Sequence, residues 1–335
     1  MRPFPHPLLV ADIGGTNARF SIAETPGAPV VSVCRVRTKE TPTAYDAIER
    51  ALAASPVRAK SVILCAAGPV MGREARLTNA QWTFDGAELA RHFGLEQGLL
   101  LNDFEAAALA LAVLEPTDAV SIGRPVPPGG GPKLVLGPGT GLGMAALVVV
   151  GARAAPLPGE AGHIGFGPLD EEDGRVFPRL EHHFGRLTPE TILSGPGLVR
   201  LHKALAPDFG RAPEAVEAEP PAVVERAASG ACAHSAATVQ AFLKHLARFS
   251  GDMGIVFAAT GGVVIRGGVM SSLAPMMDPV RFRALFEDKA PVEALARALP
   301  LMQLPSDAVI LRAMGAVGAE PDRFVIDYPA RLWRI

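Results

Sequence analysis

The chain has 335 residues, enough to bury a sizeable core in one large or two smaller domains. Its formal net charge is −2 and its few lysines are scattered singly, which argues against a general nucleic-acid binder because phosphate-backbone affinity needs clustered basic side chains. The longest apolar run, Ala106–Leu114, falls far short of the roughly 18 residues that a spanning helix needs, and the proline-broken start does not resemble a signal peptide, so we expect no membrane segment.

The first clear structural pattern is a hairpin near the start of the chain. Leu8–Ala11 and Phe20–Ala23 are apolar and predict two strands, and the residues DIGGTN between them predict a tight turn. Glycines lack a Cβ, so they allow positive φ angles and let backbone N–H groups approach a phosphate, and Thr and Asn side chains add donors. The residues of this predicted phosphate site are Gly14, Gly15, Thr16 and Asn17. Asp12 would repel a phosphate unless a hydrated Mg²⁺ lay between them, and an ordinary hairpin turn is the alternative.

The elements that follow predict an α/β domain. Val30–Val36 is expected to form a third strand, Ala44–Ala54 a helix and Ser61–Ala66 a buried strand. Such an order suits a mixed sheet whose ligand-binding edge lies at the strand ends. The loop Leu77–Trp82 places amides beside a tryptophan, and a packing role is the simpler explanation for Trp82.

Asn102 and Asp103 stand where a predicted strand, Gly98–Leu101, gives way to a predicted helix, Phe104–Leu114. The base of a phosphoryl transfer must accept a hydroxyl proton from a fixed position, and such a junction holds a carboxylate rigidly at the sheet edge. The alternative is a helix N-cap, for which Asp and Asn are both favoured. A cap accounts for one of the two residues and does not require both.

The hairpin pattern recurs in Lys133–Val150, where Gly139 and Thr140 occupy the turn. Two such hairpins suggest two related halves that face one nucleotide. The segment Gly141–Ala146 also fits the G-x-G-x-x-A dinucleotide pattern, which requires a helix to follow. The next residues, LVVV, predict a strand instead, so an NAD site is not expected.

A third glycine turn, Gly267-Gly268, follows an apolar strand and precedes a helix start. We predict that a nucleoside lies against it.

The segment Gly123–Pro132, directly before the second hairpin, has no apolar periodicity and predicts an exposed loop.

Glu and His side chains stand out in two further segments. Glu160 and His163, among small residues, offer an acceptor and a donor or acceptor for vicinal hydroxyls, although a solvated Glu and a satisfied His are the alternative. Glu190 follows Thr188-Pro189, which has the form of a helix start, so an acidic residue there also has a structural explanation.

Several motifs together resemble a known family. In this order and at these spacings they closely resemble the bacterial glucokinases of the hexokinase/actin-like ATPase superfamily, over residues 8 to about 318: DIGGTNARF, LNDFEAAALAL, GPGTGLG, PGEAGHIGF, LSGPGL and RGGV. The resemblance implies an α/β, two-domain actin-like ATPase (ribonuclease H-like) fold with mixed-sheet domains flanking a cleft. We expect a small domain of residues 1–113 plus about 318–335, and a large domain of residues 114–317.

The resemblance also implies a reaction, the ATP-dependent phosphorylation of the 6-hydroxyl of glucose. Asp103 would be the general base, and the hexose ligands would be Asn102, Asp103, Glu160, His163, Glu190 and Gly141. ATP would be held by Asp12, which acts through water on Mg²⁺, and by Gly14, Gly15, Thr16, Asn17, Gly139, Thr140, Gly267 and Gly268. A related group of sugar kinases has a Cys-rich zinc cluster after an equivalent His; residues 164–180 contain no Cys here, so we expect no zinc.

Partners and location complete the expectations. We expect ATP and a hexose as small-molecule partners, Mg²⁺ as cofactor, a homodimer, and neither nucleic acid nor membrane. Cys34, Cys65 and Cys232 are far apart and odd in number, which fits reduced thiols in the cytoplasm. The alternatives are a kinase for mannose, fructose or an N-acetylhexosamine, and a sugar-independent actin- or chaperone-like ATPase module. ADP or polyphosphate as donor stays open.

Overall fold

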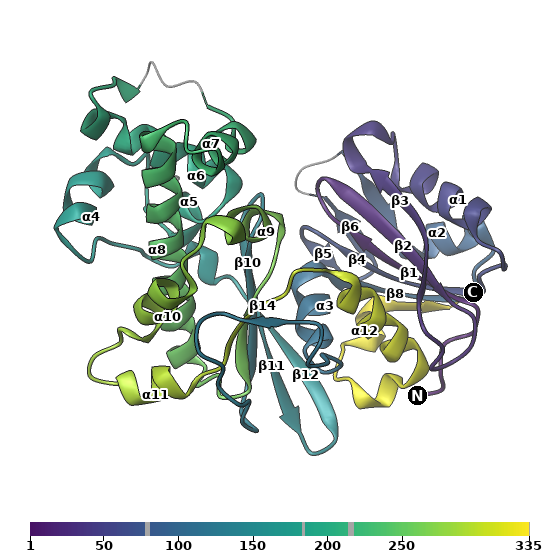
Figure 1. Ribbon diagram of the computed structural model, residues 1–335. Coiled ribbons are helices and arrows are strands. Elements are labelled where there is room, and N and C mark those ends of the chain that lie inside the picture. The colour runs from purple at the N-terminus through teal and green to yellow at the C-terminus, as the bar shows by residue number, and fades with distance from the viewer. Residues whose placement is uncertain (78–80, 183–184, 214–217, 335) are drawn as a thin grey trace. The chain divides into compact units, whose positions relative to one another are not determined.

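The structure is a computed structural model that describes residues 1–77, 81–182, 185–213 and 218–334. The chain divides into two compact units (Figure 1). Unit 1 comprises Met1–Pro116, Leu147–Pro158 and Ser306–Ile335, and unit 2 comprises Thr117–Ala146 and Gly159–Pro305. Relative to the expected division, unit 1 also takes in residues 147–158 and begins its C-terminal part at Ser306.

Unit 1 contains a six-stranded mixed sheet in the order β15-β8-β4-β1-β2-β3. β1 runs parallel to β4, and β4 runs parallel to β8, whereas the other neighbours are antiparallel. Every residue of β1 and β4 is buried, as their continuous apolar runs predict. The strands are β1 (Leu8–Ile13), β2 (Asn17–Ala23), β3 (Val31–Arg37), β4 (Ser61–Ala66), β8 (Gln97–Asn102) and β15 (Leu332–Arg334).

The first helix of unit 1, α1, begins and ends where the sequence predicts, and α3 begins one residue before the expected Phe104. Thr43 caps α1 in a capping box with Asp46, and Asp85 caps α2. α3 ends at Ala110, four residues before the expected Leu114, because the N–H groups of residues 111–113 bond to carbonyls three residues back and close a tight turn. The helices are α1 (Ala44–Ala54), α2 (Gly86–Phe93), α3 (Asp103–Ala110), α12 (Ala308–Ala319) and α13 (Tyr328–Arg331).

A small second sheet and α12 complete unit 1. The sheet has the order β5-β6-β7, with β5 (Val70–Met71), β6 (Glu74–Arg76) and β7 (Thr83–Asp85). α12 lies beside α3 and β1 (Figure 1), and Gly318 allows this approach because a Cβ there would lie 2.3 Å from Cδ2 of Leu8. α12 thus packs the C-terminal part of unit 1 against elements from the first part of the chain.

The other six-stranded sheet has the order β12-β11-β10-β13-β14-β9. β10, β13 and β14 are parallel neighbours, and β9 pairs antiparallel with β14. The predicted second hairpin is present as β10 and β11. The strands are β9 (Val120–Ser121), β10 (Lys133–Pro138), β11 (Leu142–Val150), β12 (Arg153–Gly159), β13 (Gly262–Ile265) and β14 (Leu301–Gln303).

The long helix α8 (Ala233–Val256) lies in the core of unit 2, where Phe242, Leu246 and Phe249 are fully buried. It packs against α6, α7 and α10. The other helices of this unit are α4 (Glu171–Val176), α5 (Pro189–Ile192), α6 (Gly195–Leu205), α7 (Pro220–Ala228), α9 (Gly268–Leu273), α10 (Pro279–Glu287) and α11 (Glu293–Ala298). No helix in the described ranges is both long and apolar enough to cross a membrane.

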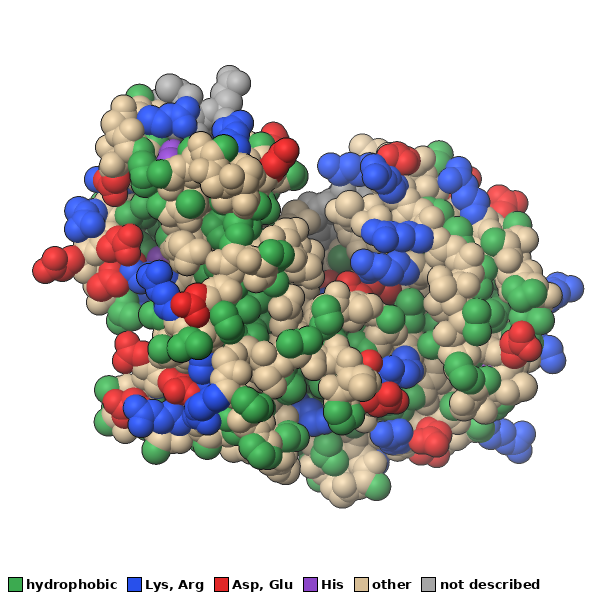
Figure 2. All heavy atoms as spheres, in the orientation of Figure 1, with side chains coloured by type: hydrophobic (Ala, Val, Ile, Leu, Met, Phe, Trp, Pro, Cys, Tyr) green, Lys and Arg blue, Asp and Glu red, His purple; other side chains and the backbone are tan. Residues whose placement is uncertain are grey.

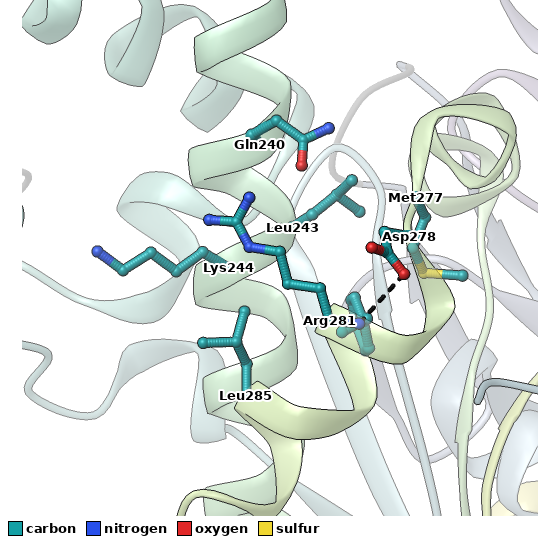
Figure 3. Close-up of a pocket in the computed structure, with 8 residues that line it drawn as sticks. Gln240, Leu243, Lys244, Met277, Asp278, Arg281 and Leu285 are labelled. Carbon is teal, nitrogen blue, oxygen red and sulfur yellow. Dashed lines mark hydrogen bonds between the residues drawn. The ribbon is translucent and has the colours of Figure 1, made fainter. Parts of the chain in front are cut away.

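A small hollow lies between α8 and α10 in unit 2 (Figure 3). Its volume is about 10 Å³, room for one water molecule at most. Beside it, Asp278 caps α10 by accepting hydrogen bonds from the N–H groups of Val280 and Arg281. The hollow contains none of the predicted site residues and is a gap in helix packing.

The C-terminal tail adds the edge strand β15 to the sheet of unit 1. Trp333 lies opposite Gly98 in this pairing and is only 1% exposed. A Cβ on Gly98 would lie 2.2 Å from Cζ2 of Trp333, and a Cβ on Gly86 would lie 2.3 Å from its Cζ3. The two glycines therefore make room for the indole ring, which the sheet and α2 enclose.

This packing predicts the effect of removing the ring. Trp333→Ala is expected to lower the free energy of unfolding of unit 1 by about 3–5 kcal/mol, as for other buried aromatic residues, and Trp333→Phe by less. Urea titration followed by fluorescence of Trp82, the other tryptophan and also in unit 1, measures the change. An unchanged midpoint for Trp333→Ala would show that the tail is not part of the folded sheet.

Candidate active site

Three parallel strands bring the predicted residues of unit 1 to one edge. In the register of the sheet, Asp12 lies opposite Cys65 and Ala66 lies opposite Asn102, so β1, β4 and β8 end side by side. Ligands of open α/β sheets bind outside the carboxyl ends of their strands. The structure thus places the predicted phosphate turn and the strand-to-helix junction at the same edge of unit 1.

The turn between β1 and β2 is closed by the Gly14 N–H, which donates to the Asn17 carbonyl at 2.9 Å. Thr38 makes two hydrogen bonds to this turn. The Thr38 hydroxyl donates to the Gly14 carbonyl at 2.9 Å, and the Thr38 N–H donates to the Thr16 carbonyl at 3.0 Å. Gly14 does not have the expected positive φ angle; a Cβ there would instead lie 3.2 Å from the Asn17 carbonyl oxygen. Glycine serves close backbone approach at this position. Thr38 was missed by the sequence analysis, because nothing in its local sequence links it to the turn.

Asp12 is buried in unit 1, with 4% of its surface exposed. Its Oδ2 accepts a hydrogen bond from Arg19 Nη1 at 2.8 Å, and the same Nη1 lies 3.4 Å from Asp307. A buried carboxylate needs such a partner, and Arg19 offsets the charge that Asp12 would present to a phosphate. Arg19 stands inside the DIGGTNARF motif, but no local signal in the sequence predicts its pairing with Asp12.

Basic side chains extend along the neighbouring strand. Arg35 on β3 lies opposite Arg19, and Arg37 lies opposite Asn17, whose side-chain oxygen accepts a hydrogen bond from Arg35 Nε at 3.2 Å. Arg35 and Arg37 are exposed, and Figure 2 shows Lys and Arg side chains gathered over this part of unit 1. Arg37 is paired with Glu40 at 3.2 Å, and Arg35 offers an exposed positive charge beside the turn.

At the junction of β8 and α3, the structure shows which of the two residues, Asn102 or Asp103, caps the helix. Asn102 is the N-cap: its Oδ1 accepts from the N–H groups of Phe104 at 2.9 Å and Glu105 at 3.3 Å. Its Nδ2 donates to the Gly68 carbonyl at 3.1 Å. The amide oxygen of Asn102 is thus occupied, which leaves one amide hydrogen for a ligand. Asp103 is the first residue of α3, and the capping role that competed with a catalytic role is filled by its neighbour.

In unit 2, Glu190 is held against the turn between β10 and β11. Its Oε2 accepts a hydrogen bond from the Leu142 N–H at 2.8 Å, and a Cβ on Gly141 would lie only 2.4 Å from that oxygen. Gly141 is therefore needed for the contact. Thr188 caps α5, as its position predicts, so Glu190 lies in the first turn of that helix.

Backbone contacts bring other predicted segments to the same turn of unit 2. The Gly139 N–H donates to the Gly141 carbonyl at 2.8 Å, and the Gly195 N–H donates to the Gly139 carbonyl at 2.8 Å, which places the start of α6 beside the turn. The loop that contains Glu160 also approaches, because a Cβ on Gly162 would lie 2.4 Å from the Leu142 carbonyl oxygen. Neither Gly139 nor Gly141 has a positive φ angle.

Glu160 and His163 lie on this loop with exposed side chains. Their relative exposures are 91% and 58%, and His163 Nε2 lies 3.8 Å from Glu160 Oε2. Both side chains are accessible to a ligand. The exposed His163 does not fit the alternative of a buried, satisfied His, whereas the exposure of Glu160 fits the solvated Glu of that alternative. Gly267 has a φ angle of 103° and precedes α9, which begins at Gly268; a Cβ on Gly267 would lie 2.8 Å from the Pro138 carbonyl oxygen. The third glycine turn thus lies against the end of β10.

One predicted loop is described only in part. Thr78 and Asn79 of the segment Leu77–Trp82 lie outside the described residues. Trp82 is 2% exposed and its Nε1 donates to the Thr41 carbonyl at 3.0 Å, so the packing role expected for it is confirmed.

Comparison with known proteins agrees with this arrangement. The model of the Glucokinase family matches residues 9–320. The glucokinase of Rhizobium meliloti (strain 1021) is 40% identical over 332 residues, which cover 99% of this chain and 97% of the relative. A glucokinase structure from an Antarctic psychrotroph has a TM-score of 0.78 at 29% identity and covers 94% of this chain and 98% of its own. A ROK family glucokinase from Streptomyces griseus, solved with glucose and AMPPNP, has a TM-score of 0.60 at 22% identity and covers 91% of this chain and 97% of its own.

The similarity to these structures shows the class of protein: the chain has the actin-like ATPase fold of the sugar kinases, as the motifs implied. The match to the family model and to relatives over nearly the whole chain then fixes the family. The chain belongs to the Glucokinase family.

The close approach of Gly141 to the Glu190 carboxylate predicts the effect of adding a Cβ at residue 141. Gly141→Ala would push the Glu190 carboxylate off the Leu142 N–H, and misplacement of a ligand residue by about 1 Å can cost up to about 100-fold in rate. We expect kcat/KM for the sugar to fall at least tenfold, measured by coupled ADP release.

A matched control is Gly174→Ala in α4, where an added Cβ meets open space. It should leave all kinetic constants unchanged. Wild-type kinetics for Gly141→Ala would show that the position of Glu190 does not matter for sugar use.

Proposed function

We propose that this protein transfers the γ-phosphoryl group of ATP to the 6-hydroxyl of glucose and releases glucose 6-phosphate and ADP. The observation that carries the proposal is the 40% identity, over nearly the full length of both chains, to a curated glucokinase. The AMPPNP and glucose bound by the Streptomyces griseus neighbour support ATP and a hexose as substrates.

Asp103 is the general base in this proposal. It accepts the proton of the 6-hydroxyl as that oxygen attacks the γ-phosphorus, and the bond from phosphorus to the bridging oxygen of ADP breaks. Asp103 is the first residue of α3, directly after the N-cap Asn102, and this capped helix start holds the backbone that carries the carboxylate. The remaining hexose ligands are Asn102, Glu160, His163, Glu190 and the turn at Gly141.

The phosphates of ATP are assigned to backbone and side-chain donors of the glycine turns. In unit 1 these are Gly14, Gly15, Thr16 and Asn17, and in unit 2 Gly139 and Thr140, with the nucleoside against Gly267 and Gly268. The exposed Arg35 adds positive potential near the first turn. Backbone N–H groups can cradle phosphates without the reorganisation that long side chains require.

Mg²⁺ is proposed to accompany ATP. Within the described ranges no group of three or more His, Cys, Asp or Glu could hold a metal ion. The carboxylate of Asp12 is buried and paired with Arg19, which fits contact through water better than direct ligation. Mg²⁺ usually keeps several waters and binds substrate phosphates plus one or two carboxylates, so Asp12 is a sufficient protein contribution. When bound, the ion would neutralise phosphate charge.

The setting of the enzyme is also proposed. All three cysteines are free thiols, which fits a reducing compartment, and we place the protein in the cytoplasm, where phosphorylated glucose would enter glycolysis. We further propose a homodimer, which sedimentation velocity would test.

Two alternatives define the test of function. A kinase for mannose, fructose or an N-acetylhexosamine would retain the chemistry with another sugar. A sugar-independent ATPase module is not favoured, because the curated relatives are named glucokinases.

ADP release from ATP-Mg, measured without sugar and with each of glucose, mannose, fructose, N-acetylglucosamine and N-acetylmannosamine, separates these cases. We expect strong stimulation by glucose and slow turnover without sugar, because a site of polar ligands rejects sugars that leave a ligand unpaired. Stimulation by another sugar alone would change the assigned substrate. Equal release under all conditions would contradict a sugar kinase.

The role of Asp103 is tested by Asp103→Asn. A general base contributes about 10²–10⁴-fold, so kcat should fall by on the order of 100-fold or more while both substrates still bind. Asp85→Asn is the matched control, because Asp85 also stands at a helix start of unit 1 and Asn retains the cap. Turnover within a few-fold of wild type for Asp103→Asn would remove Asp103 from the role of base.

A further inference from the structure

Glu105 is a buried acidic residue that the proposed reaction does not use. It lies in the first turn of α3, two residues after Asp103, and is 5% exposed. Its Oε2 accepts a hydrogen bond from the Asn102 N–H at 3.4 Å. The same oxygen is in contact with Nη1 of Arg331, a residue 226 positions further along the chain.

Glu105 and Asn102 hold each other in place. The Asn102 side chain accepts from the Glu105 N–H, and the Glu105 side chain accepts from the Asn102 N–H, so the two residues form a complete capping box. Asp103 lies between them in the chain. Any movement of the Glu105 carboxylate therefore acts on the backbone that carries Asp103.

Arg331 reaches this box from a tail that is itself anchored. It is the last residue of α13, which Asp327 caps, and the Tyr328 hydroxyl donates to the Pro321 carbonyl at 2.9 Å. The next residues form β15, where Trp333 is buried against Gly98 of β8. The backbone is thus anchored on both sides of Arg331, and the Arg331 side chain is only 22% exposed.

A carboxylate in this environment is costly without a cation. Removing one partner of a buried ion pair leaves an uncompensated charge, which is strongly destabilising where it occurs. In the described part of the chain, the ion-pair partner of Glu105 is Arg331. Without Arg331, the Glu105 carboxylate would turn toward water, and its contact with the Asn102 N–H would weaken.

We infer that Arg331, in the C-terminal tail, is a positioning residue for phosphoryl transfer, which acts through Glu105 on the junction that carries Asn102 and Asp103. The inference rests on the proposed function, because it assigns the base to Asp103. It also gives a role to the tail, which lies beyond residue 320, where the match to the family model ends.

The experiment compares full-length wild type with Arg331→Ala, Arg331→Lys and Arg334→Ala. Arg334 is the matched control: it is exposed, lies on the same tail and donates one hydrogen bond, to the Gln97 side chain at 3.2 Å. For Arg331→Ala we expect kcat with saturating glucose to fall about tenfold or more, because a misplaced base slows the reaction, while the KM for ATP changes less than about twofold. Arg331→Lys should restore most of kcat, and Arg334→Ala should behave as wild type.

Hydrogen exchange gives a readout that does not depend on activity. In Arg331→Ala, the amides of residues 102–106 should exchange faster than in wild type, with α1 and α8 unchanged. Glu105→Gln combined with Arg331→Ala should cost no more kcat than Arg331→Ala alone, because both changes act through one contact. This double variant also removes the unpaired charge, which guards against a failure of the single variant to fold.

Three results would overturn the inference. They are wild-type kcat for Arg331→Ala, equal losses for Arg331→Ala and Arg334→Ala, and unchanged exchange at residues 102–106. Absence of sugar-dependent turnover in wild type would instead contradict the proposed function. Exchange at residues 102–106 would then still decide whether Arg331 fixes the junction.

Discussion

The parallel register of β1, β4 and β8 is the constraint on which the site of unit 1 depends. Because the three strands are paired in register from Leu8, Ser61 and Gln97, they end together, and the phosphate turn and the Asn102 junction emerge at one edge. The apolar residues of these strands are buried on both faces of the sheet, which holds the strands in the core of unit 1. The residues proposed for the reaction therefore lie on turns at the strand ends, and the buried strands set the positions of those turns.

In unit 2 the equivalent constraint is close backbone approach. Glu190 can reach the Leu142 N–H only because Gly141 has no Cβ, and the loop of Glu160 can reach the same turn because Gly162 has none. A polar group held by backbone donors loses little mobility when a substrate binds, and such preorganisation is the main source of electrostatic stabilisation in catalysis. The glycines of this motif thus serve packing of the site rather than unusual φ angles.

Local signals predicted the two hairpins, the central strands of unit 1 and the start of α1, because apolar runs, glycine turns and capping residues act over a few positions. The short strands, such as β9, β14 and β15, carry too few residues for such a signal. The position of Asp103 after a strand was readable in the same way. The links between distant segments were not readable. Arg19 pairs with Asp12 across a hairpin, and Arg331 meets Glu105 only after 226 residues of chain have folded. Neither contact leaves a periodic or compositional trace. The motifs supplied the family, which the full-length relatives confirm.

The most direct test of the account is a crystal structure of the protein with glucose and a non-hydrolysable ATP analogue. The account predicts the 6-hydroxyl oxygen of glucose within about 2.6–3.2 Å of the Asp103 carboxylate, the reach required of a general base. It also predicts that the γ-phosphate of the analogue lies on the opposite side of that oxygen. Glucose bound with its 6-hydroxyl turned away from Asp103, beyond the reach of one bridging water, would contradict it.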